Sequence, residues 1–274
     1  MTAGDEALRD TSRRGAGYDD FVAEFYDHVP THRQLEDLAF YDELARAQGG
    51  SVIELGCGTG RVLIPLARAG RTVLGLDGSA PMISLCREKL MLEPESVRER
   101  ARLMIADMRR FDVGRSFRLA IVAFRSFQHL LTVADQRACL DCVRRHLLDG
   151  GLLALNLFNP DLGRLADAGR AEEQGDEPPF ELPDGRRVRR TWRNPAVDLF
   201  NQVLDCELIY HVTHPGGREE RLVHSFPIRY LFRYEAEHLL ARCGFEVEDV
   251  YADFDRSPVG SRVPGELIFL ARKR

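Results

Sequence analysis

The sequence predicts an α/β protein built on an open, doubly wound and largely parallel sheet, with an antiparallel β insertion after the fifth strand. Short apolar runs bounded by glycine alternate with segments of helical periodicity over residues 51–158, and strands separated by helices of this length imply right-handed crossovers. After residue 185, branched or aromatic residues alternate with polar ones, as in strands with one solvated face. At about 150 residues per domain, the 274 residues fit one domain with a substantial insertion.

The same patterns divide the chain into five parts. We expect a disordered N-terminus (1–16), N-terminal helices (17–48), an α/β core (49–160), a linker with the antiparallel insertion (161–233), and a C-terminal helix with a strand pair that completes the core sheet (234–274). The linker, residues 161–185, is rich in Gly, Pro and acidic residues, which predicts a mobile surface segment.

Individual elements follow from local periodicity. Apolar residues three or four positions apart predict helices over 18–26 and 31–48, and the glycine-bounded apolar run 51–55 indicates a strand buried on both faces. Further core strands are expected at 72–76, 102–106, 119–124 and 152–158, with helices at 60–69, 80–90 and 134–148. The later part is predicted to hold strands at 187–192, 199–211 and 221–232, a helix at 234–242, and strands at 246–253 and 266–272.

Composition narrows the class of protein. No uninterrupted apolar run approaches the roughly 18 residues of a membrane helix, and the polar N-terminus lacks the apolar stretch of a secretory signal, so we expect a cytoplasmic location without membrane contact. Six dispersed cysteines favour reduced thiols, and Cys139 and Cys142 are expected to share one helix face without binding a metal. The net charge of −5 gives no support to nucleic-acid binding, although residues 186–233 carry nine arginines against five acids.

A glycine-rich segment between a predicted strand and a predicted helix is the most informative motif. It reads Glu54-x-Gly56-x-Gly58-x-Gly60. Glycines allow positive φ and a close approach of a ligand to the backbone, and the following helix start offers free N–H groups. A dinucleotide site requires G-x-G-x-x-G, but the sixth position from Gly56 is Arg61. The segment also lacks the Lys-Ser/Thr ending of a P-loop.

Three further features follow this motif in order: Asp77 at the end of the second strand, Asp107 at the end of the third, and a Gly150-Gly151 turn that leads into the fifth. With them the chain resembles the class I S-adenosylmethionine-dependent methyltransferases, strongly over residues 50–158 and more weakly over the final strand pair. The resemblance implies a Rossmann-like, seven-stranded methyltransferase sheet. It also implies S-adenosyl-L-methionine as methyl donor, with S-adenosyl-L-homocysteine as product.

The resemblance assigns roles to individual positions. Asp77 would accept the ribose hydroxyls, Asp107 the adenine amino group, and Glu54 either loop amides or the methionine ammonium group. Met82 would pack on the adenine and Met108 would donate its backbone N–H. The cofactor-binding residues expected are Glu54, Gly56, Cys57, Gly58, Gly60, Asp77, Met82, Asp107, Met108 and Phe124. A turn acid at Asp77 and plain core packing at Met82 are the alternatives.

The methyl acceptor should lie beyond the carboxyl ends of the strands. His129, just after the fourth strand, is the candidate base or orienting group, and a structural histidine is the alternative. Residues 23–29 (AEFYDHV) resemble the N-terminal lid of antibiotic-sugar and glycine N-methyltransferases, where a tyrosine approaches the sulfonium or the acceptor. Tyr26 is therefore the second catalytic candidate, against a lid residue that only packs on the core. Arg33 is a weaker candidate for holding a carboxylate.

Several methyltransferase subclasses lack their motifs here. The sequence has no [DNS]-P-P-[YFW] after the fourth strand, no double-glutamate loop, and no acidic cluster for magnesium. We therefore expect methyl transfer to N, O or C of a small metabolite or natural product. The alternatives are a non-methylating S-adenosylmethionine-binding protein, or a nucleic-acid or protein methyltransferase that uses the basic insertion. That insertion is expected to form a solvated face or a homodimer contact, or else to bind an anionic acceptor through Arg193, Arg229 or Arg233.

Overall fold

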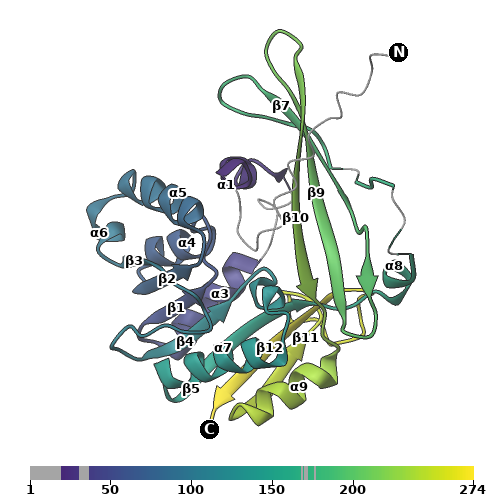
Figure 1. Ribbon diagram of the computed structural model, residues 1–274. Helices are drawn as coiled ribbons and strands as arrows, with labels where there is room; N and C mark the ends of the chain where they lie inside the picture. Colours follow the sequence, from purple (N-terminus) through teal and green to yellow (C-terminus); the bar gives the residue numbers. More distant parts are fainter. Residues whose placement is uncertain (1–19, 31–36, 168, 170–171, 176) are drawn as a thin grey trace.

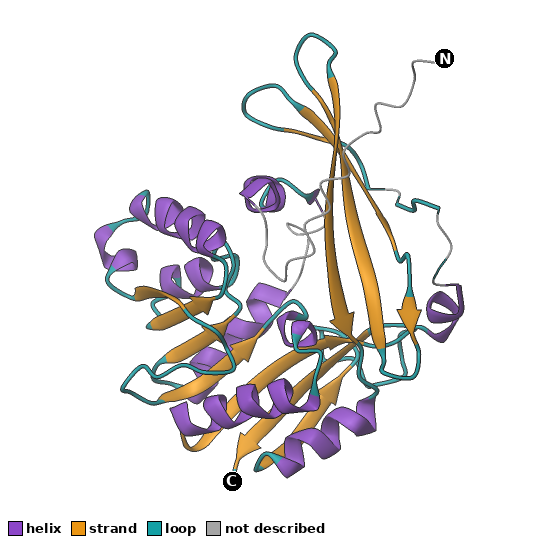
Figure 2. Ribbon diagram, in the orientation of Figure 1, coloured by secondary structure: helices purple, strands orange, loops and turns teal. Residues whose placement is uncertain are grey.

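The computed structural model describes residues 20–30, 37–167, 169, 172–175 and 177–274. A seven-stranded sheet forms its base, in the order β11-β12-β5-β4-β1-β2-β3 (Figures 1 and 2). The strands are β1 (Val52–Leu55), β2 (Val73–Asp77), β3 (Ala101–Ile105), β4 (Phe117–Val122), β5 (Leu147–Phe158), β11 (Phe245–Tyr251) and β12 (Glu266–Lys273). The first five strands run parallel, and β12 pairs antiparallel with both β5 and β11. The predicted fold class is confirmed.

Helices cover both faces of this sheet, as a doubly wound fold requires. They are α3 (Asp37–Gln48), α4 (Leu63–Arg68), α5 (Ala80–Met91), α6 (Glu95–Arg98), α7 (Val133–His146) and α9 (Arg233–Arg242). One buried cluster joins the sheet to α3, α4 and α5, and a second joins it to α7 and α9. Strand β1 is buried at every position, because it lies at the centre of the sheet between two helix layers.

Two predicted boundaries in the core were wrong. The helix expected at 60–69 begins only at Leu63, which puts Pro65 in its first turn, where the missing N–H has no intrahelical partner to lose. The helix expected at 134–148 ends at His146 because β5 begins at Leu147. Gly150 and Gly151 therefore lie within β5, next to a register shift between β4 and β5, rather than in a turn before it.

The insertion is a separate antiparallel sheet that rises from the base (Figure 2). Its strands are β6 (Phe180–Glu181), β7 (Arg187–Arg193), β8 (Val197–Asp198), β9 (Val203–Thr213) and β10 (Glu219–Arg229). The order is β10-β9-β7-β6, with β8 paired to β9. The long β9–β10 hairpin keeps its register from Glu219 opposite Thr213 to Arg229 opposite Val203.

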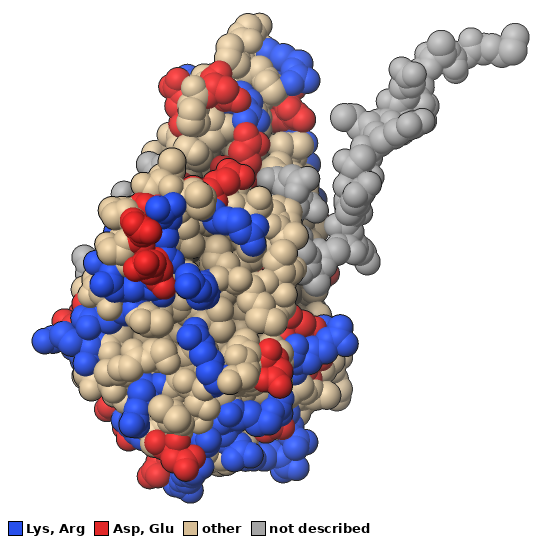
Figure 3. All heavy atoms as spheres, turned by 90° about the vertical axis from the view of Figure 1, so that its left-hand side faces the viewer, with Lys and Arg blue, Asp and Glu red and all other residues tan. Residues whose placement is uncertain are grey.

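The linker before this sheet is more structured than predicted. It holds α8 (Leu162–Asp167) and β6, and Gln174 bridges to Trp192 of β7. Its acids also pair with the insertion, since Glu173 accepts from Arg221 at 2.9 Å and Glu177 forms an ion pair with Arg190. The excess of arginine over residues 186–233 is therefore offset by acids from the linker. On the face of the molecule in Figure 3, basic and acidic side chains are likewise interspersed.

Helix α1 (Asp20–Tyr26) lies between the base and the insertion (Figure 1). Its Phe25 is fully buried and packs on Tyr210 of β9, with ring centroids 5.4 Å apart. On the opposite side, Val22 and Ala23 pack on Met82 of α5. The expected N-terminal disorder, the start of the helix predicted at 31–48, and Arg33 all lie outside the described residues.

A single buried side chain joins the two ends of the insertion. Gln128, which is 0% exposed, accepts from the backbone N–H of Phe158 at 3.0 Å and donates to the carbonyl of Arg229 at 3.2 Å. The chain thus leaves the base after β5 and returns to it at neighbouring points. No helix among the described residues is long and apolar enough to cross a bilayer.

Candidate active site

The glycine loop after β1 has the backbone that its sequence predicts. Gly56, Gly58 and Gly60 have φ values of +70°, +53° and +84°, a region that favours glycine. A Cβ on Gly56 would lie 2.5 Å from the Ser126 hydroxyl, and one on Gly60 would lie 2.5 Å from the Cys86 sulfur. At Gly56 and Gly60 the loop therefore packs so closely on neighbouring side chains that a larger residue would clash.

Asp77, at the end of β2, fixes the shape of this loop. Its Oδ2 accepts from the backbone N–H of Gly58 at 2.8 Å, and its Oδ1 accepts from the N–H of Ser79 at 2.8 Å. Burial raises the pKa of Asp77, and these two amides act in the opposite direction. Each carboxylate oxygen retains a second lone pair that can accept a hydroxyl hydrogen.

Glu54 is a buried acid with an unsatisfied oxygen. Its side chain is 2% exposed, and its Oε2 has no hydrogen-bond partner among the described residues. Burial raises the pKa of Glu54 to about 8, although the nearby Arg61 opposes the shift. An unpaired buried acceptor is costly, so this position suits a cationic ligand group that would complete the site.

A buried ion pair stands beside Glu54. Arg61 binds both oxygens of Asp37, at 2.8 and 2.6 Å, and Asp37 is 1% exposed. The same guanidinium lies 5.4 Å from the ring centroid of Phe124, within the range of a cation–π contact. The arrangement links the glycine loop to α3 and to the end of β4.

Residues after β4 adopt an unusual backbone. Phe124 and Arg125 have φ values of +48° and +67°, which non-glycine residues rarely adopt. The Phe124 ring meets Tyr26 edge to face, with centroids 6.5 Å apart. Residues held in such conformations cluster at functional sites. The sequence offered no signal for this strain.

The adenine-side candidates have partners of their own. The carboxylate of Asp107 accepts from the Arg109 guanidinium at 2.7 Å and from its backbone N–H at 2.9 Å, an ion pair that the sequence analysis did not anticipate. Met82 is 2% exposed and contacts α1. Met108 lies beside Gly56, and the buried Cys57 packs its sulfur towards Gly75 of β2.

A cavity of about 380 Å³ lies between the base, α1 and the insertion. Both catalytic candidates, Tyr26 and His129, line it, together with Phe124. The walls from α8 and the insertion include Arg164, Trp192, Arg193, Glu207, Tyr210 and Phe226. Because Phe124 contacts Arg61 of the glycine-loop region, the cavity and the loop share one wall.

The two catalytic candidates are both uncharged near neutral pH. Burial, with a smaller contribution from His224, lowers the pKa of His129 to about 4, so its imidazole is neutral above that pH. The His129 ring lies 5.4 Å from that of Phe226. Burial raises the pKa of Tyr26, so its hydroxyl stays protonated and can donate a hydrogen bond.

The arginines proposed as anion binders are already paired. Arg193 forms an ion pair with Glu207 at 2.5 Å, Arg229 one with Glu235 at 3.3 Å, and Arg233 one with Glu237 at 2.8 Å. Of these three, Arg193 alone lines the cavity. Each of these charges is thus balanced by a carboxylate that the fold brings near, a partner that a local excess of arginine does not reveal.

Arg164 was missed by the sequence analysis. It lines the cavity from α8 and lies 4.9 Å from the ring centroid of Trp192, the one tryptophan of the chain. Within the described part of the protein, Arg164 has no carboxylate partner. Asp161, the nearby acid at the cavity wall, accepts from the N–H groups of Gly163 and Arg164 at the start of α8.

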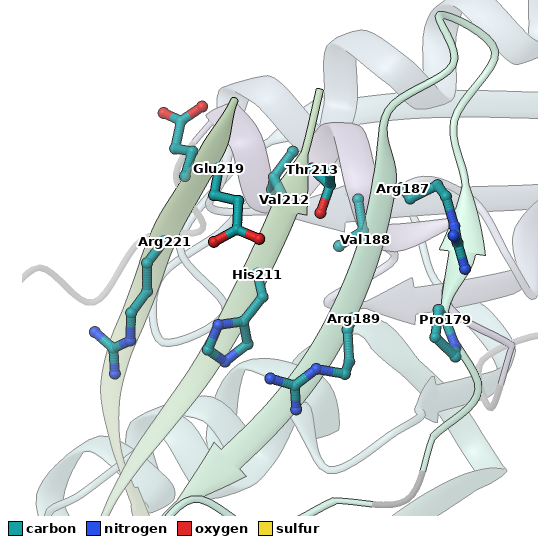
Figure 4. Close-up of a pocket in the computed structure, with 10 residues that line it drawn as sticks. Pro179, Arg187, Val188, Arg189, His211, Val212, Thr213, Glu219 and Arg221 are labelled. Atoms are coloured by element: carbon teal, nitrogen blue, oxygen red, sulfur yellow. The ribbon is translucent and has the colours of Figure 1, made fainter. Parts of the chain in front are cut away.

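A second concavity, of about 650 Å³, lies on the outer face of the insertion (Figure 4). Arg187 and Arg189 of β7 line it together with His211 and Arg221. Although burial acts to raise it, hydrogen bonds from Arg221, Thr191 and His211 lower the pKa of the adjacent Glu173 to about 2. Its lining residues all come from the linker and the insertion, whereas Phe124 of the smaller cavity contacts Arg61 beside the glycine loop. We therefore place the candidate site in the smaller cavity.

Comparison with known proteins agrees with this geometry. Residues 52–151 match the family model described as "Methyltransferase domain". The chain therefore carries a methyltransferase domain over these residues, and it resembles the S-adenosylmethionine-dependent methyltransferases. The expected cofactor, S-adenosyl-L-methionine, is supported, since similar solved structures are described as SAM bound and as complexed with S-adenosyl-L-homocysteine. The small-molecule branch that the motifs indicated is also supported.

Two similar proteins illustrate the relationship. The chain is 33% identical over 146 residues to dTDP-3-amino-3,6-dideoxy-alpha-D-glucopyranose N,N-dimethyltransferase of Streptomyces fradiae, an alignment that covers 51% of this chain and 54% of that protein. It therefore spans about half the length of this relative. The solved structure of the CcbJ methyltransferase from Streptomyces caelestis has a TM-score of 0.72 and 25% identity, and the match covers 93% of this chain and 99% of that one.

Proposed function

We propose that this methyltransferase transfers a methyl group to an amine of a small molecule, an amino sugar or a related natural product, bound in the 380 Å³ cavity. The wall shared between this cavity and the glycine-loop region carries the proposal, because it brings an acceptor and the cofactor to one place. The volume lies within the range of small-molecule sites. The Streptomyces fradiae relative named above, whose printed acceptor is an amino sugar, supports the choice of acceptor.

The cofactor would be held by the residues that the motifs assign. Glu54, with its unsatisfied oxygen, would bind the ammonium group, and Asp77 would accept ribose hydroxyls with its remaining lone pairs. Asp107 and Met108 would hydrogen-bond to the adenine. For this, the Arg109 guanidinium would have to release one of its hydrogen bonds to the Asp107 carboxylate. Met82, Cys57, Phe124 and the three loop glycines would complete the walls.

The bound cofactor supplies a methyl group already activated on a sulfonium sulfur. The acceptor nitrogen would use its lone pair to form the new C–N bond as the C–S bond breaks, leaving S-adenosyl-L-homocysteine, and the nitrogen would lose one proton. The protein mainly aligns the two reactants, which supplies about 7–11 kcal/mol in favourable cases. His129 would accept a hydrogen bond from the amine, but with a pKa of about 4 it would pass the proton on to solvent. Tyr26 would orient the acceptor through its hydroxyl.

Radiolabelled methyl transfer tests this proposal. We expect label in amino sugars but not in analogues that carry a hydroxyl in place of the amine. His129→Ala and Tyr26→Phe should both lower kcat. Asp42→Asn should not, because Asp42 pairs with Arg71 and neither residue lines the cavity. If both site variants keep full activity on the accepted sugar, the catalytic assignment is wrong. If hydroxyl analogues are methylated equally well, the amine assignment is wrong.

A further inference from the structure

Asp27, which follows α1, joins this helix to two parts of the base. Its Oδ1 accepts from the hydroxyl of Thr59 at 2.7 Å, and its Oδ2 accepts from the ammonium of Lys89 at 2.6 Å. Thr59 lies inside the glycine loop and is 0% exposed, and Lys89 lies in the last turn of α5. One carboxylate therefore fixes the end of α1 to both the loop and the helix beside it.

The two contacts of Asp27 differ in strength. The pair with Lys89 is about one-third exposed on both sides, and exposed ion pairs contribute little to stability. The hydroxyl of Thr59 is buried, and a buried hydroxyl that loses its acceptor costs free energy because water cannot replace the lost partner. The Thr59 contact is thus the one that holds α1 against the loop.

The other side of α1 is attached to the insertion. Glu24 forms an ion pair with Arg186 at the start of the insertion sheet, and the Arg186 guanidinium lies 5.5 Å from the ring centroid of Phe25. The Phe25 ring packs in turn on Tyr210 of β9. Helix α1 is therefore anchored on the glycine loop at one end and on the cavity wall along its length.

We propose that Asp27 is a positioning residue that acts through α1: it holds the neighbouring Tyr26 at the boundary between the cofactor and the acceptor cavity. This rests on the proposed function, which places the two reactants on either side of that boundary. The Tyr26 ring meets that of Phe124 edge to face, and Phe124 contacts Arg61 beside the glycine loop. Tyr26 also lines the acceptor cavity.

The proposal makes the α1–loop contact part of cofactor binding. When the contact is intact, α1 covers Met82 and the loop holds its amides in place. When it is lost, α1 is released from the loop, while the base, which has its own buried clusters, stays folded. Cofactor affinity and the placement of Tyr26 should therefore change together, and overall stability should change little.

Calorimetry with S-adenosylhomocysteine tests the contact through matched variants. Thr59→Val removes the hydroxyl while keeping the side-chain shape. We expect the dissociation constant of S-adenosylhomocysteine to rise about 10–150-fold, the equivalent of a lost hydrogen bond to a charged group. Thr59→Ser keeps the hydroxyl and should stay within about twofold. Asp27→Ala, which removes the acceptor oxygen, should resemble Thr59→Val. Asp42→Asn, in the half-buried pair with Arg71, should bind like the wild type.

A double-mutant cycle and a kinetic measurement complete the test. If the two side chains act as one contact, the double variant Thr59→Val/Asp27→Ala should bind S-adenosylhomocysteine no more weakly than the weaker-binding single variant. With an accepted amino sugar, the variants should also lower kcat, because Tyr26 is displaced. Additive losses, or a lower melting temperature with unchanged cofactor affinity, would overturn the proposal. If Thr59→Val does not fold, the cofactor affinities of Asp27→Ala and Thr59→Ser still decide the outcome.

The result is separable from that of the proposed function. Non-additive losses of cofactor affinity without methyl transfer to any amino sugar would leave Asp27 in its role and reject the acceptor. Methyl transfer to amino sugars with an additive cycle would reject the role of Asp27 alone.

Discussion

Glu54→Gln should remove a pH dependence of the free energy of unfolding that this buried acid causes. In the folded chain the pKa of Glu54 is raised from 4.5 to about 8 by burial. Between these two values the unfolded chain has released the proton and the folded chain retains it, so the free energy of unfolding falls as pH rises. At about 1.4 kcal/mol per pKa unit, the loss between pH 4.5 and pH 8 has a ceiling of about 5 kcal/mol.

Urea unfolding at a series of pH values measures this effect. The wild type should lose stability from pH 5 to pH 8, and Glu54→Gln, whose side chain does not titrate, should lose much less. Glu248→Gln is the matched control, since Glu248 is a surface acid paired with Arg272 at 2.6 Å and its pKa is lowered, not raised. A wild-type stability that is flat from pH 5 to pH 8, or equal slopes for wild type and Glu54→Gln, would refute the reasoning.

The cofactor provides a second measurement on the same carboxyl. A cationic ammonium group at Glu54 favours the ionised form, so binding near pH 7 should release about one proton. Calorimetry of S-adenosylhomocysteine in buffers of different ionisation enthalpy reads this number directly. The affinity of the wild type should rise from pH 6 to pH 8, and that of Glu54→Gln should be weaker and independent of pH. Proton uptake on binding would place Glu54 in a different role.

Three other variants probe the remaining assignments. Asp77→Asn should weaken S-adenosylhomocysteine binding about tenfold, because one carboxylate oxygen that shapes the loop becomes a donor; calorimetry measures this, and unchanged affinity would remove Asp77 from the site. Since the pKa of His129 is lowered to about 4, the rate of methyl transfer should show no fall due to this histidine between pH 8 and pH 5. A fall in rate centred near pH 6.5 that is present in the wild type but absent in His129→Ala would contradict this. Since Arg164 lies over the single Trp192, glucose 1-phosphate should change the tryptophan fluorescence more than glucose does. Arg164→Met should abolish this difference between the two sugars, whereas Arg189→Met, on the outer face of the insertion, should keep it. Equal fluorescence responses of the wild type to both sugars would exclude an anionic acceptor group at Arg164.

The parts of the fold and site that the sequence predicted correctly are those encoded by local chemistry. Gly56, Gly58 and Gly60 predict a loop with positive φ values, because few residues other than glycine adopt this backbone conformation. The core strands are apolar at consecutive positions because both faces are covered. These signals depend on a residue and its near neighbours, so one sequence suffices to interpret them.

The features that were missed depend on partners far apart in the chain. Thr59 meets Asp27 from 32 residues away, and the charge of Arg193 is balanced by Glu207 across two strands. The linker was expected to be a mobile segment, but its Glu173 and Glu177 find arginine partners on the insertion. Such pairings follow from how the elements pack, which no local pattern encodes.

The connection made by Gln128 has a consequence for the evolution and engineering of this methyltransferase. Since this one side chain bonds to the backbone at Phe158 and at Arg229, everything between these residues enters and leaves the base through a single junction. The insertion is therefore a segment that can be exchanged as a unit. Recombination with a relative at these two positions would replace the outer wall of the acceptor cavity. The strand order of the base and the glycine loop would pass through such an exchange unchanged.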